Sequence, residues 1–334
     1  MAEAGKRAMS TAGPSGHRRQ PDPARRRLLH AGLAASAMLA APPAPAAPAA
    51  PAAIASGQAG PGAAPRIATL DWTVVETLLA LGVTPVAAAD AAGYRRWVGQ
   101  PPMPDGVTEI GLRTEPNLEA LVGARPDLIV ITPQFERSRF LLERIGAVRS
   151  IDFYPGAGDA LGHAEHAAAT IADWCGRPRR ATALITEARR QLAECGERVA
   201  ARKPLRDRPL LIAQFADARH LRLFGAHSLF DAVLARLGLR NAWSGSGSPW
   251  GSDLVPLTRL AAFDDAALVH VAPLPGYVRL ALRDDPLWRA MPFVRARRVI
   301  ALPACWPFGG VPSALHFATR LLAPAAHPDD ILDA

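Results

Sequence analysis

The sequence lacks the short motifs that mark most enzymes and metal sites. It has no CxxC pair, no HExxH segment and no cluster of histidines and cysteines at ligand spacing, so nothing in it predicts a zinc site. It has no P-loop and no strand-linked GxGxxG fingerprint, and Gly245–Ser248 does not have the spacing of a GxSxG nucleophile elbow. We therefore predict a protein that is not an enzyme and has no metal ion or cofactor of its own.

Cysteine is scarce, with only Cys175, Cys195 and Cys305 in 334 residues. The apolar periodicity predicts one continuous helix carrying Cys175 and Cys195, which would lie roughly 30 Å apart, beyond disulfide reach. An exported chain with an odd number of cysteines and no pairing pattern is expected to keep free, buried thiols.

Residues 1–64 are predicted to be an export signal and an Ala/Pro-rich leader. Arg25–Leu29 (RRRLL) precedes a short apolar stretch, Ala31–Ala41, followed by small residues at A-x-A sites. This arrangement is typical of a secretory signal, and the paired arginines before two leucines fit the twin-arginine route. The apolar stretch is too short to span a membrane. The sequence thus predicts a periplasmic protein, and the alternative is a basic, disordered N-terminus.

The positive charge is concentrated in this N-terminal segment. The whole chain carries +8, and residues 1–52 contribute +5 from seven basic and two acidic residues. The remainder has 31 basic and 28 acidic residues, or +3, with its arginines dispersed. The high isoelectric point therefore gives no support for a nucleic-acid partner.

The clearest structural unit is Glu109–Thr132 (EIGLRTEPNLEALVGARPDLIVIT). Its pattern predicts the end of an extended segment, then a helix capped by Thr114, and then a buried parallel strand over Leu128–Thr132. Arg113 falls in the loop between strand and helix, and open α/β sheets bind ligands at that end of their strands. The alternative role for Arg113 is a surface salt bridge with Glu109 or Glu115.

The pattern predicts an α/β fold of two parallel-sheet (Rossmann-like) lobes with a ligand cleft between them. The predicted parts are an N-terminal lobe over 65–161, a connecting long helix over 162–203, and a C-terminal lobe and tail over 204–334. Such a helix would extend about 50–60 Å, too long to pack inside one lobe. The alternative is two helices broken at Gly176–Pro178.

Aromatic residues recur in segments that are predicted to be loops near strand ends. They are Trp97, Phe135, Trp250, Trp306 and Phe308. Each alone is more often a core residue than part of a ligand site. Taken together with Arg113, however, they favour a binding site.

Several segments carry a resemblance to a known family. GLRTEPNLEAL…PDLIV, RHLRLFGAHSLF, WGSDLV and ALPACWPFGGVPSALHF follow one another within roughly Pro65 to Leu322. Together they resemble the periplasmic substrate-binding proteins for ferric-hydroxamate siderophores. The resemblance implies a monomer that captures an Fe(III)-hydroxamate siderophore and delivers it to an ABC permease with its ATPase subunit. Hydroxamate oxygens saturate the iron themselves, which agrees with the missing ligand cluster.

The resemblance also assigns pocket positions. It makes Arg113 the hydroxamate-contacting arginine and places Trp97, Trp250, Ser252 and Trp306 in the pocket. An arginine offers rigid donors to the hydroxamate oxygens, and tryptophan faces suit the partly apolar arms of the ligand.

The chain departs from the family pattern at three of its positions. Phe135 and Phe308 stand where the family has tyrosine, and Ile131 where it has tryptophan. Two phenolic donors are therefore missing, and the expected ligand is a different hydroxamate or a less polar chelate unless Ser252, Asn241 or water replaces them.

The acidic residues with which the family docks on its permease fall at Phe140 and Thr258. Glu136, Glu143 or Asp253 are the substitutes that the sequence offers.

Two alternative functions remain at this point. The same fold could bind haem or a corrinoid, and a haem would need an axial ligand such as Tyr94 or Tyr277. An exported α/β enzyme would instead use His220 or His316.

Overall fold

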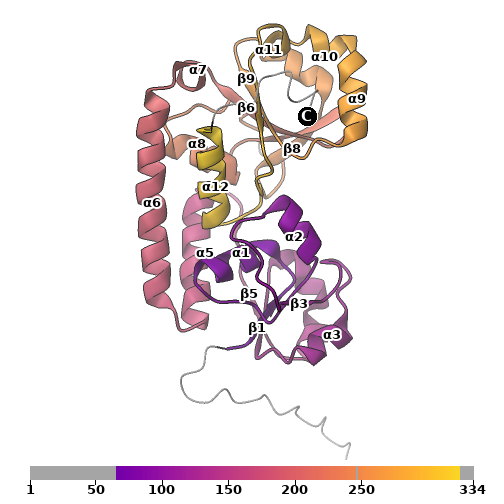
Figure 1. Cartoon of the computed structure of the whole chain (residues 1–334), viewed down its shortest axis with the longest axis vertical. Helices are drawn as coiled ribbons and strands as arrows, with labels where there is room; N and C mark the ends of the chain where they lie inside the picture. The colour runs from indigo at the N-terminus through magenta and orange to yellow at the C-terminus, as the bar shows by residue number, and fades with distance from the viewer. Residues whose placement is uncertain (1–64, 246, 324–334) are drawn as a thin grey trace, which may run out of the picture. The chain divides into compact units, whose positions relative to one another are not determined.

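The computed structural model describes residues 65–245 and 247–323. These residues form two five-stranded sheets, each flanked by helices, as Figure 1 shows. The predicted α/β fold with two lobes is confirmed, and the export signal predicted for residues 1–64 lies outside the described residues. Of the helices in the described ranges, none combines the length and the apolar character that crossing a membrane requires.

The sheet of the N-terminal lobe is wholly parallel. Its strands are β1 (Ile67–Thr69), β2 (Ala87–Ala88), β3 (Thr108–Glu109), β4 (Leu128–Ile131) and β5 (Ala147–Ser150), in the order β3-β2-β1-β4-β5. β1 and β4 are buried along their whole length, because apolar runs of this kind are covered on both faces. Parallel strands end at the same edge of a sheet, so the segments that follow β1, β3, β4 and β5 come together there.

The helices of this lobe are α1 (Trp72–Ala80), α2 (Ala91–Trp97), α3 (Leu118–Gly123) and α4 (Arg139–Leu142), with a 3₁₀ helix, η1, over Pro133–Ser138. The cap predicted for α3 is wrong. Asn117, rather than Thr114, accepts a hydrogen bond from the Ala120 amide at 3.0 Å. Helix α2 lies where a loop was expected, and Asp90 caps it by accepting from the Gly93 amide.

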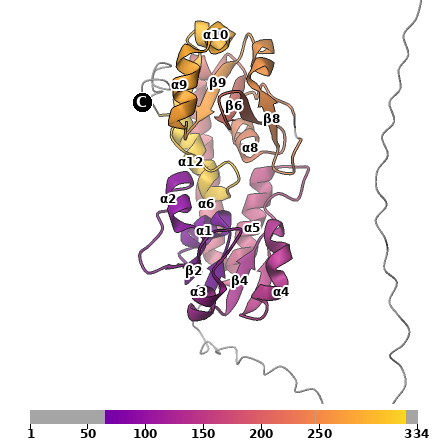
Figure 2. The same cartoon turned by 90° about the vertical axis from the view of Figure 1, so that its right-hand side faces the viewer.

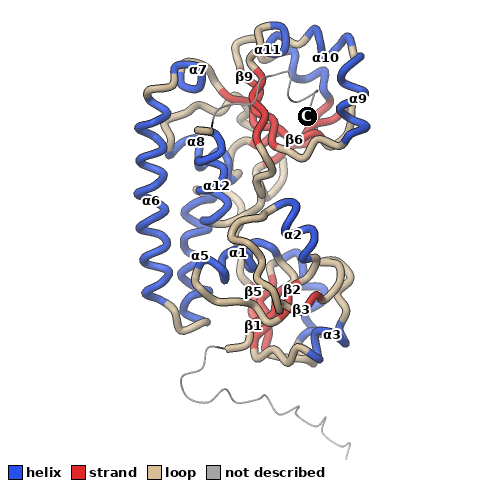
Figure 3. The backbone as a smooth tube through the Cα atoms, viewed as in Figure 1, coloured by secondary structure: helices blue, strands red, loops and turns tan. Residues whose placement is uncertain are grey.

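The connecting segment consists of two helices, α5 (Ala160–Trp174) and α6 (Pro178–Ala200). The predicted continuous helix is therefore wrong, and the alternative break is observed. Gly176 takes the left-handed conformation with φ +65°, and Pro178 opens α6 at a position where no amide donor is needed. α5 and α6 lie side by side in Figure 3, joined by two hydrogen bonds from Arg189 to Glu165 at 2.5 and 3.0 Å.

The break separates the two cysteines that were expected on one helix. Cys175 is the C-cap residue directly after α5, whereas Cys195 lies on α6. Both thiols, and that of Cys305, are free and buried as predicted. Burial raises the pKa of Cys175 to about 11 and that of Cys305 to about 12, which keeps these thiols protonated and unreactive at neutral pH.

The sheet of the C-terminal lobe is mixed. Its strands are β6 (Leu210–Phe215), β7 (His220–Phe224), β8 (Ser252–Pro256), β9 (Ala267–Val271) and β10 (Val299–Leu302), in the order β10-β9-β6-β7-β8. β10, β9 and β6 are parallel, as expected. β7 and β8 are antiparallel to their neighbours, so the prediction of a wholly parallel second sheet is wrong at this edge.

A tight turn explains the reversal between β6 and β7. Asp217 accepts hydrogen bonds from the amides of Arg219 at 2.7 Å and His220 at 2.8 Å. An aspartate that bonds its own following backbone stabilises such a turn, and a short turn can join only antiparallel strands.

The remaining helices of the described chain are α7 (Lys203–Arg206), α8 (Leu229–Arg236), the 3₁₀ helix η2 (Leu257–Ala262), α9 (Gly276–Asp284), α10 (Pro286–Ala290), α11 (Pro292–Arg295) and α12 (Val311–Leu321). α12 packs against α1 and α5 as well as against α6 and α8, and Figure 2 shows it between the two sheets. One apolar core therefore runs through both lobes, with Val74 of α1, Ile171 of α5, Phe230 of α8 and Phe317 of α12 among its members.

Candidate functional site

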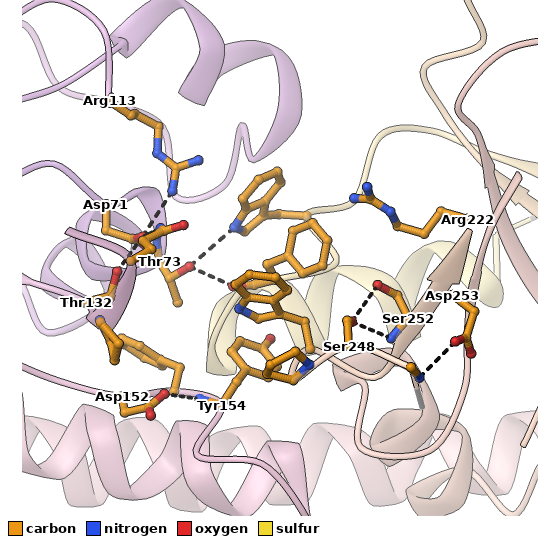
Figure 4. A pocket seen from close by; sticks show the side chains of 18 of the residues that line it. Asp71, Thr73, Arg113, Thr132, Asp152, Tyr154, Arg222, Ser248, Ser252 and Asp253 are labelled. Carbon is orange, nitrogen blue, oxygen red and sulfur yellow. Dashed lines mark hydrogen bonds and ion pairs between the residues drawn. The ribbon is translucent and has the colours of Figure 1, made fainter. Parts of the chain in front are cut away.

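A cavity of about 680 Å³ lies between the two lobes. Its N-terminal-lobe wall comes from the segments after β1, β3, β4 and β5, and its other wall from β7, β8 and the segment between β10 and α12 (Figure 4). The position is the one at which open α/β sheets bind ligands, and the volume suits a small organic ligand.

Arg113 lies on this cavity, and an aspartate holds it there. Its Nη2 donates to Asp71 Oδ2 at 3.0 Å, and its Nε donates to the Leu70 carbonyl at 3.3 Å. The guanidinium carbon lies 4.5 Å from the ring centroid of Trp72. Nη1 has no intramolecular hydrogen bond in the described part of the chain, so this edge of the guanidinium remains available to a ligand.

Asp71 is the main residue of the site that sequence reasoning missed. It follows β1 and caps α1 by accepting from the Thr73 amide at 2.7 Å. Its Oδ2 accepts from Arg113, from Thr132 Oγ1 at 3.0 Å and from Gln134 Nε2 at 2.6 Å. An aspartate before a helix predicts a cap, but nothing local indicates an arginine 42 residues further on. The salt-bridge partner of Arg113 is therefore Asp71 rather than Glu109 or Glu115.

Aromatic rings form a wall beside Arg113, whose guanidinium carbon lies 5.7 Å from the ring centroid of Trp306. Phe308 stands between Trp250 and Trp306, with ring centroids 6.0 and 5.3 Å away, and Trp306 meets Trp72 edge to face at 5.0 Å. Trp250, Trp306 and Phe308 line the cavity, and Trp250 is 41% exposed. The structure therefore brings these three predicted site residues together on the cavity.

The backbone of this wall is attached to the N-terminal lobe. Thr73 Oγ1 donates to the Phe308 carbonyl at 2.7 Å and accepts from Trp306 Nε1 at 3.3 Å. Tyr154 donates through its hydroxyl to the Gly309 carbonyl at 2.7 Å. Glu76 of α1 accepts from the Gly310 amide and from the Ser313 hydroxyl, both at 2.5 Å.

Two predicted site residues do not line the cavity. Trp97 ends α2 and packs with Tyr94 and Met103 in an apolar cluster beside the site. Phe135 is buried in the core cluster behind β4, and its ring centroid lies 5.7 Å from the guanidinium of Arg113. Ile131 is buried in the same cluster. The departures at positions 131 and 135 therefore lie behind the cavity wall.

Polar groups line the C-terminal side. Ser252, another predicted site residue, lines the cavity, and its Oγ is 3.1 Å from Ser248 Oγ. Asn241 cannot replace a missing donor, because its Nδ2 is committed to the Phe224 carbonyl and to Asp231. The two serine hydroxyls are thus the hydroxyl donors that this side offers in place of the missing phenols.

Arg222 also lines the cavity and was not predicted. It lies on β7, and its guanidinium carbon is 5.5 Å from the ring centroid of Phe308. The alternation of polar and apolar residues over His220–Leu223 is typical of an antiparallel strand and could have located it.

The residues named for haem or enzyme function lie elsewhere. Tyr94 is buried and donates to the Pro101 carbonyl at 2.6 Å, and Tyr277 is 61% exposed on α9. His220 pairs with Asp217, and His316 accepts from Arg320. None of these residues is among those that line the cavity. In residues 65–245 and 247–323, no three His, Cys, Asp or Glu side chains are grouped as metal ligands.

Gly251 shapes the segment that carries Trp250 and Ser252. Its φ is +66°, and a Cβ there would lie 2.2 Å from the Ser228 amide nitrogen and 2.5 Å from the Ala226 carbonyl oxygen. We expect Gly251→Ala to lower the free energy of unfolding by at least about 2 kcal/mol, through backbone strain and overpacking. Urea unfolding measures this effect. The matched control is Gly276→Ala, where the added Cβ meets nothing within 4 Å, and equal midpoints for the two variants would contradict the prediction.

Comparisons with known proteins show which family this chain resembles. The model of the periplasmic binding protein family matches residues 67–305. The iron(3+)-hydroxamate-binding protein FhuD of Escherichia coli is 39% identical over 260 residues, which cover 77% of this chain and 85% of that protein. The crystal structure of the siderophore-binding protein FhuD from Vibrio cholerae, bound to Fe³⁺-Desferal, has a TM-score of 0.71 at 28% identity and covers 79% of this chain and 100% of that one.

A more distant structure shows the breadth of the fold. The triscatecholate siderophore-binding protein FeuA from Bacillus subtilis, complexed with ferri-bacillibactin, has a TM-score of 0.62 at 16% identity and covers 80% of this chain and 94% of that one. This likeness supports the fold alone. The three named relatives are binding proteins rather than enzymes.

Proposed function

The chain belongs to the periplasmic binding protein family, and from this premise we propose that it captures a ferric hydroxamate siderophore and delivers it to an ABC permease. The observation that carries the proposal is the open edge of Arg113 on a cavity of about 680 Å³ that Trp250, Trp306 and Phe308 also line. The 39% identity to a protein named for iron(3+)-hydroxamate binding supports the choice of ligand.

The chemistry of binding follows from the ligand. Hydroxamate oxygens fill the coordination sphere of the iron, so the protein supplies hydrogen-bond donors rather than metal ligands. Arg113 Nη1 donates to these oxygens, and Asp71 holds the guanidinium in place from behind. The rings of Trp250, Trp306 and Phe308 pack against the apolar arms of the ligand.

The missing phenols bear on which hydroxamate is bound. Phe308 lines the cavity without a hydroxyl, and the hydroxyl of Tyr154 is committed to the Gly309 carbonyl. We infer that Ser248 and Ser252 supply the donors on this side, and that the ligand differs from those of the tyrosine-bearing relatives.

Location and partners are part of the proposal. The family supports a periplasmic protein, and we propose twin-arginine export through a signal within residues 1–64, followed by action as a monomer.

For docking on the permease, Glu136 and Glu143 are the acidic candidates beside Phe140, which is 66% exposed. Both pair with Arg139 on the surface. Asp253 is a weaker candidate, because both of its carboxylate oxygens accept hydrogen bonds within the lobe.

A tryptophan-fluorescence titration tests the site. A ferric hydroxamate bound in the cavity is expected to quench Trp250 and Trp306 saturably. Arg113→Ala is expected to raise the Kd about tenfold to a hundredfold, since a hydrogen bond to a charged group contributes about 1.5–3 kcal/mol. The matched control is Arg95→Ala, which removes an exposed arginine of α2.

Ferrichrome, ferrioxamine B, a ferric catecholate and haemin are compared in the same assay. Saturation by the catecholate or haemin with none by either hydroxamate would overturn the proposed function.

A further inference from the structure

Arg222 is a cation in the cavity that the binding mechanism above does not use. It is partly buried on β7, facing the ring of Phe308. Within residues 65–245 and 247–323, its side chain forms no hydrogen bond and no ion pair. A partly buried guanidinium whose donors are unused is a site for an anionic group.

The carboxylates that line the same cavity do not neutralise it. Asp71 is bound by Arg113, Thr132, Gln134 and the amide of Thr73. Figure 4 shows Asp71 and Asp152 on the wall away from Arg222, where Asp152 accepts from the Tyr154 amide.

Asp253 of β8 also lines the cavity, and its carboxylate is occupied as well. Its two oxygens accept from Trp243 Nε1 at 2.7 Å and from the Gly247 amide at 2.8 Å. Its β8 position pairs with Leu223 rather than with Arg222, and side chains alternate between the two faces of a strand. The register therefore directs Asp253 and Arg222 to opposite faces of the sheet.

The same register places the Ser252 hydroxyl on the face of the sheet that carries Arg222. β7 and β8 pair Arg222 with Leu254 and Phe224 with Ser252. Ser252 is thus the diagonal neighbour of Arg222 on one face of the sheet, within reach of a long side chain. Ser248 lies 3.1 Å from Ser252. The unused donors of the Arg222 guanidinium are thus near these two hydroxyls, and a planar guanidinium matches a carboxylate.

We propose that Arg222 makes the cavity selective for ferric hydroxamates that carry a free carboxylate on an organic arm. This inference rests on the proposed function. Arg113 holds the hydroxamate oxygens from the N-terminal lobe, and Arg222 receives the carboxylate from the opposite wall. A ligand whose arm ends in an ammonium group meets repulsion at the same position.

A matched set of three ligands tests the proposal. Ferrioxamine B has a free ammonium group, its N-acetyl derivative has no charge there, and its N-succinyl derivative ends in a carboxylate, while the iron centre is the same in all three. We expect the mature wild-type protein to bind the succinyl form about tenfold to a hundredfold more tightly than the acetyl form, and ferrioxamine B least tightly. The preference should shrink as salt is raised.

Arg222→Leu separates charge recognition from a structural role. The variant is expected to lose affinity for the succinyl form, to keep its affinity for the acetyl form, and to bind ferrioxamine B more tightly than wild type. Arg222→Lys, which keeps the positive charge without the planar donor pair, should retain part of the preference.

Two results would overturn the inference. Equal affinities of the wild type for the three ligands, or an equal loss for all three in Arg222→Leu, would contradict charge recognition while leaving the proposed function in place. If none of the three hydroxamates binds to the wild type, whereas a ferric catecholate or haemin does, both the proposed function and the inference are wrong.

Discussion

Asp71→Ala is expected to lower the free energy of unfolding by about 3–5 kcal/mol, because it removes one partner of a buried ion pair. The carboxylate is 4% exposed and accepts hydrogen bonds from Thr73, Arg113, Thr132 and Gln134. All of these donors would lose their acceptor together, and α1 would lose its cap. The affinity for a ferric hydroxamate should also fall more than tenfold, since Arg113 would no longer be held beside the cavity.

Asp71→Asn is the matched variant for this prediction. Asparagine caps a helix as well as aspartate, so α1 should keep its first turn. The amide cannot replace the charge opposite Arg113, and the loss of stability should be smaller than for alanine while binding stays impaired. Urea unfolding and fluorescence titration of both variants measure the two effects. Unfolding curves that coincide for wild type, Asp71→Asn and Asp71→Ala would show that the carboxylate does not stabilise the fold.

Glu76 is expected to make stability depend on pH in a direction unusual for a carboxyl group. Burial raises the pKa of the Glu76 carboxyl from 4.5 to about 8, although the bonds from Ser313 and Gly310 favour its charged form. Between these two pH values the folded chain holds one proton that the unfolded chain has released. The contribution of Glu76 to the free energy of unfolding is therefore complete below pH 4.5 and falls by about 1.4 kcal/mol for each pH unit up to about 8.

Glu76→Gln isolates this contribution from those of other titrating groups. Glutamine keeps an acceptor for the Gly310 amide and a donor for the Ser313 hydroxyl, without a titratable proton. The variant should match wild type near pH 5 and be clearly more stable near pH 8.5, as measured by urea unfolding across that range. Glu76→Ala should be destabilised by about 2–4 kcal/mol even at pH 5, because it leaves a cavity and an unpaired buried amide. A difference between wild type and Glu76→Gln that does not change with pH would contradict the assignment.

Much of the fold was predictable because its signals are local. The apolar run of β4 and the loop position of Arg113 follow from neighbouring residues. The break between α5 and α6 also had a local signal in Gly176 and Pro178. The amphipathic pattern continues on both sides of this break, and it led to the prediction of one helix. Two helices packed side by side show the same sequence period as one long helix.

The rest of the site depends on contacts between distant parts of the chain. Asp71 reaches Arg113 and Gln134 across 42 and 63 residues, and no spacing rule in the sequence links them. Residue type alone could not distinguish Trp97 and Phe135, which pack in apolar clusters, from Trp250 and Phe308, which line the cavity. Aromatic rings occur both in cores and in binding sites. The direction of Trp97 and Phe135 is decided by α2 and η1, which turn the two rings toward apolar clusters beside and behind the cavity.

The attachment of the aromatic wall has a kinetic consequence. The segment between β10 and α12 is fastened to one lobe through its strand and to the other through Thr73, Glu76 and Tyr154. A wall held at both ends is already in place before the ligand arrives, and little conformational entropy remains to be lost during the encounter. Related ligands should then associate at similar rates, and their affinities should differ mainly in how long each complex lasts before it dissociates.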